Sequence, residues 1–201
     1  MFQLQGFSFN EYSKYRYFLI GCVYMAKITI FGLAGTGKST TGKILKEKLG
    51  YEYISTGSIF RAMAENEGMS LNDFEQLSDT TDKYDKELDN KTKEYGENND
   101  NFIFDSRLAW HFIPDSFKIK LDCDFDTRTV RIAEREIKDL DKVRDETIHR
   151  EDLITKRYKN YYGIEDFSND KNFDLVVDTK VNNAQKVVEI IMKELELRKI
   201  I

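Results

Sequence analysis

The sequence predicts an α/β fold of three layers, in which helices cover both faces of a five-stranded parallel sheet. Short apolar runs alternate with longer helical stretches from Ala26 to the C-terminus, which is typical of parallel strands joined by crossover helices. A glycine-rich segment separates the first apolar run from the helix after it. The length of 201 residues fits one domain, which we place at residues 25–201.

The expected elements follow one another in a regular order. Five strands are expected as short apolar runs at 27–31, 51–54, 101–105, 117–123 and 173–179. Helices are expected at 38–49, 57–68, 71–94, 125–137, 141–162 and 183–197. Gly50 marks the end of the first helix, and the last helix gathers its apolar residues on one face, so it should cover the sheet. The segment GENND (96–100) is poor in apolar residues, and we expect a mobile loop there.

Composition excludes several classes of protein. The net charge of −5 argues against a nucleic-acid partner. Cys22 and Cys123 stand far apart with no CxxC, so we expect neither zinc nor a disulfide, as in a reducing cytoplasm, and Cys123 should be a core residue at a strand end. No run approaches the ~18 apolar residues of a membrane span. We expect a cytoplasmic monomer with no membrane partner.

The first 24 residues differ from the rest of the chain. They contain eight aromatic residues but show no helical or strand period. We interpret residues 1–24 as an N-terminal extension with Met25 as the natural start; the alternative is an appendage docked on the domain. The apolar stretch Tyr17–Ile20 is shorter than the ~7–15 residues of a signal sequence core.

The glycine-rich segment predicts a nucleoside-triphosphate site. The pattern GxxxxGK[ST] is matched in full by Gly32, Leu33, Ala34, Gly35, Thr36, Gly37, Lys38 and Ser39. Because Gly35 and Gly37 lack Cβ atoms, the backbone can curl and point its N–H groups at an anion, to which the helix adds its positive end. Lys38 should reach the β- and γ-phosphates, and the Ser39 hydroxyl is a ligand for Mg²⁺.

Further residues favour a small-molecule kinase among the proteins with this segment. The chain has neither a DxxG segment nor [NT]KxD, which argues against a GTPase. After the second strand, STGSIFRAM offers a second anion site formed by Ser55, Thr56, Gly57 and Arg61. Asp105 and Arg107 follow the third strand, and ligands in such sheets bind beyond the carboxyl ends of the strands. Asp105 is expected to hold the water shell of Mg²⁺ or to orient the acceptor.

Arginines are concentrated late in the chain, where six of the ten lie between Arg128 and Arg157. Arginine forks onto phosphate oxygens, so a closing arginine-rich lid can position and neutralise a transferring phosphoryl group. We expect this role for Arg131, Arg135, Arg150 and Arg157. The alternative is pairing with Glu134, Glu136 or Glu151, and for Arg144 we favour ion pairing.

These motifs together resemble the short, archaeal-type branch of the cytidylate kinases, which are nucleoside monophosphate kinases. The resemblance spans residues 26–195 and is most specific in the segment from STGSIFR to GMSLNDF. Further matching segments are GLAGTGKSTTGKILKEKLG, DKELDNKTKEYG, FDSRLAW, RIAERE and REDLITKRYKNYYGI.

The resemblance implies a three-layer P-loop kinase fold with a helical acceptor-binding segment at about 56–96 and a helical lid at about 135–163. It implies transfer of the γ-phosphoryl group from ATP, assisted by Mg²⁺, to CMP or dCMP. By position, residues 32–40, ending at Thr40, hold the ATP phosphates, while Arg61 and Arg107 hold the acceptor. Arg131 lies by the adenine and Arg135 by the transferring phosphates; the remaining clamp consists of Arg150 and Arg157.

The sequence departs from the family pattern at the acceptor side. The third strand ends in Asp105-Ser106-Arg107, where Glu-Gly-Arg is usual, and the lid carries Leu153 and Ile154 where polar residues are usual. Two alternatives therefore remain. One is a kinase of AMP, UMP or a non-nucleotide acceptor on the same scaffold, and the other is a module that senses ATP without transferring phosphate.

Overall fold

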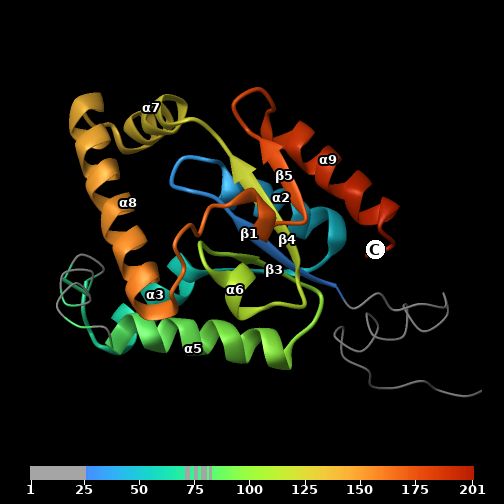
Figure 1. Ribbon diagram of the computed structural model, residues 1–201, viewed down its shortest axis with the longest axis horizontal. Coiled ribbons are helices and arrows are strands. Elements are labelled where there is room, and N and C mark those ends of the chain that lie inside the picture. The colour runs from blue at the N-terminus through green and yellow to red at the C-terminus, as the bar shows by residue number, and fades with distance from the viewer. Residues whose placement is uncertain (1–25, 71–72, 75–76, 78–80, 82) are drawn as a thin grey trace, which may run out of the picture.

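The computed structural model describes residues 26–70, 73–74, 77, 81 and 83–201 (Figure 1). The N-terminal extension expected over residues 1–24 lies outside the described residues. Five parallel strands form one sheet in the order β2-β3-β1-β4-β5, which confirms the predicted sheet. The strands are β1 (Lys27–Phe31), β2 (Glu52–Ser55), β3 (Phe102–Asp105), β4 (Phe117–Asp122) and β5 (Leu175–Asp178).

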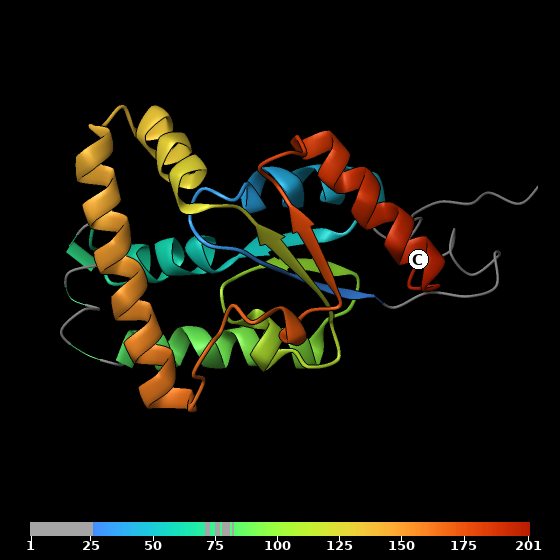
Figure 2. The ribbon, with the colours of Figure 1, turned by 45° about the horizontal axis from the view of Figure 1, so that its top comes forward.

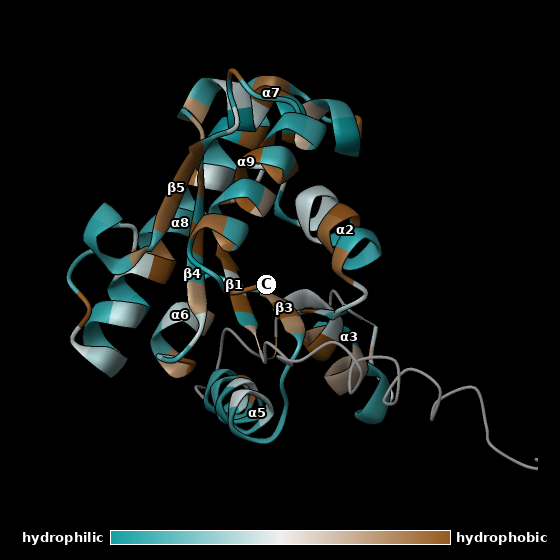
Figure 3. Cartoon of the chain, turned by 90° about the vertical axis from the view of Figure 1, so that its right-hand side faces the viewer, coloured by the Kyte–Doolittle hydropathy of each residue, from teal (hydrophilic) through white to brown (hydrophobic). Residues whose placement is uncertain are grey.

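Helices cover both faces of this sheet, as Figure 3 shows. On one face α2 (Lys38–Leu49) and α9 (Ala184–Leu197) pack on strand residues such as Ile28 and Ile30. On the other face α5 (Lys83–Asn98) and the short α6 (Ala109–Phe112) cover Phe102 and Phe104 of β3. Successive strand residues point to opposite faces, so β1 and β3 each supply side chains to both layers.

The register of the strands brings their carboxyl ends to one edge of the sheet. Ile30 of β1 and Ser55 of β2 both lie opposite Asp105 of β3. The turn after β1 and the start of α3 (Thr56–Asn66) therefore begin beside Asp105. A capping box fixes the start of α3, because the side chains of Ser55 and Ser58 each bond to the other's backbone N–H.

A pair of helices stands beyond this edge of the sheet (Figure 2). The first is α7 (Phe125–Glu136), and the second is α8 (Leu140–Tyr162), a single helix of 23 residues. Residues 137–139 join them, and Ile137 has a φ of 53°, in the left-handed region, and is 94% exposed. In both ribbon views α8 runs from α7 toward the N-terminal end of α5. Within the described residues, no helix has both the length and the apolarity needed to cross a membrane.

The expectation of a mobile loop at 96–100 is wrong for its first three residues, which form the end of α5. Gly96 is buried where α5 approaches the loop after α6, and a Cβ there would lie 2.7 Å from Cγ1 of Ile113. The amides of Asn98 and Asn99 donate to backbone carbonyls one turn back. The segment is ordered by close backbone packing, so its lack of apolar side chains was misleading.

Smaller differences concern the ends of elements and two short helices. The sequence missed α6 and the 3₁₀ helix Asp170–Asn172, since both are too short to show a period. Within the described residues, α5 begins at Lys83 rather than forming one helix from residue 71. Cys123 directly follows β4 and is buried, as expected.

Candidate active site

The segment between β1 and α2 forms a tight loop whose glycines are required by its geometry. Gly35 and Gly37 have φ angles of 84° and 87°, a region that L side chains rarely adopt. A Cβ on Gly35 would also lie 2.5 Å from the backbone oxygen of Arg128. Helix α2 starts directly at Lys38 and has no side-chain cap, so the N–H groups of its first turn are available to an anion.

Lys38 is held against this loop, with Nζ donating to the Leu33 carbonyl at 3.2 Å. Burial lowers the pKa of Lys38 to about 8; the nearby charge of Asp105 opposes the shift, while the nearby arginines, among them Arg107 and Arg150, add to it. A partly buried ammonium group surrounded by other cations is a strong attractor for phosphate oxygens.

Asp105 accepts hydrogen bonds from two hydroxyl groups at the carboxyl edge of the sheet. Its Oδ2 accepts hydrogen bonds from Ser39 at 3.1 Å and from Tyr53 at 2.8 Å, and the residue is 5% exposed. Burial raises the pKa of Tyr53, and the Asp105 charge adds to the shift, so the phenol stays protonated. The Ser39 hydroxyl and the Asp105 carboxylate are hard oxygen donors in contact with each other, which fits Mg²⁺.

This pair does not form a metal site on protein ligands alone. In the described part of the chain, no three His, Cys, Asp or Glu residues come together to hold a metal. Mg²⁺ is commonly bound by one or two carboxylates together with water and substrate phosphates, so the small oxygen set is sufficient. Sequence reasoning missed Tyr53. The only indication in the sequence is the glycine at position 42, inside the expected helix: a Cβ there would lie 2.3 Å from the Tyr53 ring.

Arg128 connects the loop to α8, a role that sequence reasoning also missed. Its side chain is 4% exposed, and Nη1 donates to the Ala34 carbonyl at 3.2 Å. The same guanidinium forms a two-pronged pair with Glu151 of α8, at 2.7 and 3.3 Å. Its Nε donates to the Cys123 carbonyl. The buried guanidinium of Arg128 therefore links the phosphate loop to α8.

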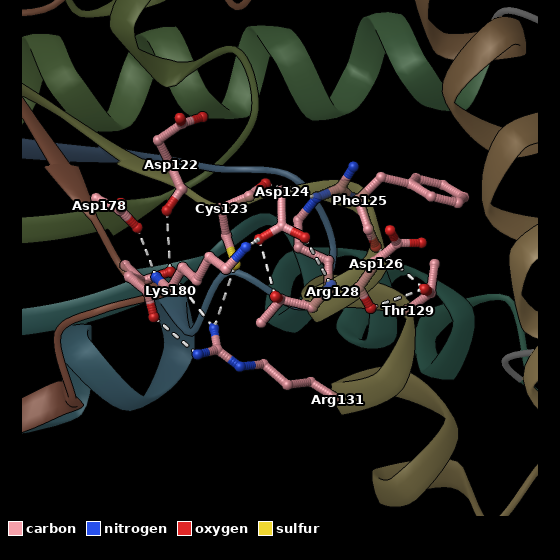
Figure 4. Close-up of polar contacts among 12 residues, drawn as sticks. Asp122, Cys123, Asp124, Phe125, Asp126, Arg128, Thr129, Arg131, Asp178 and Lys180 are labelled. Carbon is pink, nitrogen blue, oxygen red and sulfur yellow. Dashed lines mark hydrogen bonds and ion pairs between the residues drawn. The ribbon is translucent and has the colours of Figure 1, made fainter.

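Arg131 of α7 extends its guanidinium to the other side of the phosphate loop, beside the residues that follow β5. Figure 4 shows its guanidinium reaching back past Cys123 toward the segment that carries Lys180. It donates to the Thr179 carbonyl at 2.7 Å and approaches the Gly35 carbonyl at 3.4 Å. Its expected place by the adenine stays a prediction. In this structure Arg131 joins the loop after β1 to the loop after β5.

A cavity of about 690 Å³ opens where these elements meet. The phosphate loop contributes Ala34, and the start of α3 contributes Thr56 and Gly57. The remaining walls come from the end of β3, one face of α5 and the facing sides of α7 and α8. The structure thus brings the expected donor loop, the acceptor segment and the arginine-rich helices around one space.

Two arginines of this cavity act on Lys38, which is not itself among the lining residues. Arg107 and Arg150 both line the cavity, and each acts electrostatically on Lys38. Burial lowers the pKa of Arg107, and its Nε is buried with no hydrogen-bond partner among the described residues. A buried donor normally has a partner. Two arginines in the cavity, one of them with an unpaired donor, and a lysine under their influence point to an anionic ligand.

Arg157 occupies a different part of the same cavity. It lies seven residues after Arg150, about 10 Å along α8, and forms an ion pair of 2.9 Å with Asp85 of α5. The next acid on that face, Asp89, accepts a short hydrogen bond from the hydroxyl of Tyr162. All four residues line the cavity. Sequence reasoning expected Arg157 in the site but missed Asp85, Asp89 and Tyr162, although acids four apart on a helix share one face.

The remaining candidates are arranged less tightly. Arg135 lines the cavity, but its side chain is 65% exposed and paired with Glu136, the alternative considered from the sequence. Arg61 does not line the cavity, although its Nη1 would lie 3.7 Å from a Cβ on Gly57, which does. Arg144 pairs with Asp126 at 2.6 Å, as expected for an ion-paired residue.

The phosphate loop and the five-stranded parallel sheet define the chain as a P-loop kinase by class. The solved shikimate kinase of Bacteroides thetaiotaomicron has the same fold, with a TM-score of 0.58 and 16% identity over 87% of this chain and 99% of that one.

The particular family follows from the comparison of sequences. The chain belongs to the cytidylate kinase-like family, whose model matches residues 27–181. The cytidylate kinase of Methanobrevibacter smithii is 38% identical over 170 residues, which cover 85% of this chain and 98% of the relative. That of Archaeoglobus fulgidus is 39% identical over 175 residues, or 87% and 97%. The resemblance found in the motifs is confirmed.

Proposed function

We propose that the protein transfers the γ-phosphoryl group of ATP to CMP or dCMP, forming ADP and CDP or dCDP. The observation that carries this proposal is that Arg107 and Arg150 line one cavity and both act electrostatically on Lys38, with the Arg107 Nε buried and unpaired among the described residues. A single phosphate loop would not need two further arginines, one from the segment after β3 and one from α8. Two anionic substrates that meet end to end would need them.

In the proposed donor site, the backbone of residues 32–40 and Lys38 bind the ATP phosphates. Arg131 lies beside the adenine, where its bonds to Thr179 and Gly35 fix the entrance between two loops. In the proposed acceptor site, Arg107 and Arg61 bind the nucleotide phosphate. Ser55, Thr56 and Gly57 at the start of α3 support this site, because they leave room for close approach to the first turn.

We further propose that Ser39 and Asp105 bind Mg²⁺ together with the ATP phosphates. When bound, Mg²⁺ would neutralise charge on the phosphates and orient them. Tyr53 holds the Asp105 carboxylate toward Ser39 through its 2.8 Å hydrogen bond. Asp105 thus has a positioning partner that is independent of the nucleotide.

The reaction requires alignment more than proton transfer. An oxygen of the acceptor phosphate is already anionic, so it attacks the γ-phosphorus without a general base, and the bond to the β–γ bridging oxygen breaks. Lys38, Arg135 and Arg150 would stabilise the charge that develops on the equatorial oxygens. Arg157, on the same face of α8, is proposed to complete the arginine clamp around the acceptor.

A coupled ADP-release assay across CMP, dCMP, UMP, AMP and GMP tests this proposal. We expect release with CMP and dCMP in the presence of Mg²⁺, and loss of activity with EDTA. Release with another monophosphate alone would establish the rival small-molecule kinase. ATP-dependent heat protection without transfer to any monophosphate would establish the ATP-sensing module and overturn the proposed function.

We propose that the catalytic unit is residues 25–201, with an acceptor-binding segment at about 56–96 and a lid at about 135–163. We propose that the protein acts as a monomer. We also propose a role in pyrimidine nucleotide metabolism, in the cytoplasm.

A further inference from the structure

We propose that Arg128 and Glu151 form a positioning pair, which holds the Arg150 side chain of α8 at the phosphate loop for phosphoryl transfer. This inference rests on the proposed function and adds two residues whose part in it is to place another side chain. It starts from a buried ion pair that the proposed reaction leaves unused. The pair joins α7 to α8, the two helices that stand beyond the carboxyl edge of the sheet (Figure 2).

The N–H donors of Arg128 are used within the protein. Its Nε donates to the Cys123 carbonyl, and its Nη1 donates to the Ala34 carbonyl. Nη1 and Nη2 also donate to the two carboxylate oxygens of Glu151, at 2.7 and 3.3 Å. Four of the five guanidinium N–H donors are thus engaged, and Arg128 does not line the cavity. It therefore acts by holding other groups and not by binding phosphate.

The partners of Arg128 belong to segments that build the proposed site. Ala34 lies in the phosphate loop, and Cys123 directly follows β4. Glu151 comes directly after Arg150 in α8, and Ala34, Arg150 and Glu151 all line the cavity. Because Arg150 and Glu151 share one turn of a helix, an interaction that fixes Glu151 also fixes the backbone that carries Arg150.

A second ion pair joins the same two helices and differs in its surroundings. Arg144 of α8 bonds to Asp126 of α7, and the exposed fractions of the two side chains are 38% and 74%. For Arg128 and Glu151 these fractions are 4% and 25%. Exposed pairs contribute little to stability, whereas a two-pronged arginine–carboxylate pair is strong and directional. The Arg128–Glu151 pair is therefore the one suited to fix the orientation of α8.

The charge of Glu151 is needed as well as its geometry. The charge of Arg128 acts on Lys38, and the charge of Glu151 acts on Arg107. Like charges repel, so a further uncompensated cation beside Lys38 would oppose the approach of Arg150. The Arg128–Glu151 pair is neutral overall. It links α8 to the loop without adding to the repulsion among the cations that are proposed to bind phosphate.

The test is a double-mutant cycle between Glu151→Gln and Arg150→Met, assayed with ATP and CMP. Glutamine keeps the size of the side chain but loses the charge and one of the two acceptors. We expect Glu151→Gln to lower kcat about 10- to 100-fold, the range for a group displaced by about 1 Å, with KM for ATP changed less than about threefold. When Arg150→Met is already present, adding Glu151→Gln should lower kcat by no more than about twofold.

The matched control is Asp126→Asn, which breaks the exposed pair between the same helices and should keep the wild-type kcat. Arg128→Lys tests the other member of the buried pair. It keeps the charge but loses the planar fork, so kcat should fall several-fold. A pair that only stabilises the fold would lower Tm and leave kcat of the folded variants unchanged, and this result overturns the proposal. If Glu151→Gln does not fold, an unchanged kcat in Arg128→Lys overturns it.

The outcomes distinguish this inference from the proposed function. An equal fall in kcat from Glu151→Gln with and without Arg150 would show that Glu151 does not act through Arg150, and overturns the positioning role. A wild-type enzyme that phosphorylates CMP, with a Glu151→Gln variant that keeps its kcat, overturns only this role. If the wild type accepts another monophosphate alone, the choice of CMP is overturned and the cycle is measured with that acceptor. A wild-type chain that phosphorylates no monophosphate overturns both.

Discussion

The phosphate loop and the side chains where α5 faces α8 both line one cavity, and they are built in different ways. The loop is one continuous segment, shaped by positive φ angles at Gly35 and Gly37 and fastened by Arg128, whose side chain is 4% exposed. The α5–α8 region is assembled from side chains of separate helices, and the exposed fractions of its Arg157–Asp85 pair are 30% and 18%. A site formed by buried backbone tolerates few substitutions. A site formed by partly exposed side chains can be altered by single substitutions, and so can accommodate a different acceptor.

The largest expected effect is at the loop itself. Lys38→Ala should lower kcat about 100- to 1,000-fold, the range found when one directed charge or donor is removed from a transition state. Steady-state kinetics with CMP measures this effect. Lys43→Ala, on the exposed surface of α2, is the matched control and should retain activity. Unchanged turnover in Lys38→Ala would refute the assignment of the donor site.

The next effect concerns how firmly the loop is fastened. Arg128→Met should lower the free energy of unfolding by about 3 kcal/mol, because it leaves Glu151 without its buried partner. Arg144→Met is the matched control, since Arg144 pairs with Asp126 in an exposed position and should contribute about 0.5 kcal/mol. Urea denaturation compares the two. Equal decreases in the free energy of unfolding would mean that the Arg128–Glu151 pair stabilises the fold no more than an exposed ion pair.

An effect of about 2 kcal/mol is expected at the acceptor side. Arg61→Ala should raise KM for CMP roughly 30-fold with little change in KM for ATP, as for loss of one charged hydrogen bond. Arg198→Ala, at the end of α9, provides a control of the same type at a distance from the cavity. If ATP affinity falls instead, the acceptor pocket has been placed at the wrong end.

The last effect is a dependence of stability on pH. The pKa of Lys38 is lowered by burial to about 8 in the folded chain, against 10.5 as its ordinary value. Between those values the unfolded chain binds more protons, so the folded state gains stability as the pH rises. Without nucleotide, Lys38→Met should therefore raise the melting temperature at pH 7, and the gain should shrink between pH 8 and 10. A gain that is constant with pH would show that Lys38 titrates normally.

The same difference between the two regions explains what the sequence predicted. The phosphate loop was predicted residue by residue, because a local pattern determines a local backbone. Asp105 and Arg107 were predicted as well, because the carboxyl ends of parallel strands share one edge of the sheet. The order of strands and helices followed from the alternation of apolar runs with helical periods.

The missed residues act through partners that are far away in the sequence. Tyr53 bonds to Asp105 across 52 residues, and Tyr162 bonds to Asp89 across 73. Arg128 reaches Ala34 across 94 residues. No local pattern encodes such pairs, because they depend on how helices pack over the sheet. The fold was therefore predicted more completely than the acceptor end of the site.

The left-handed backbone at Ile137 has a mechanical consequence. A β-branched residue in this region costs on the order of 1–2 kcal/mol, since Cβ crowds the following carbonyl. The exposed Ile137 side chain offers little packing to offset that torsional energy. If α8 rotates relative to α7 and the φ angle of Ile137 becomes negative, this torsional energy is released. Nucleotide binding would then need to supply less free energy to bring the arginines of α7 and α8 together.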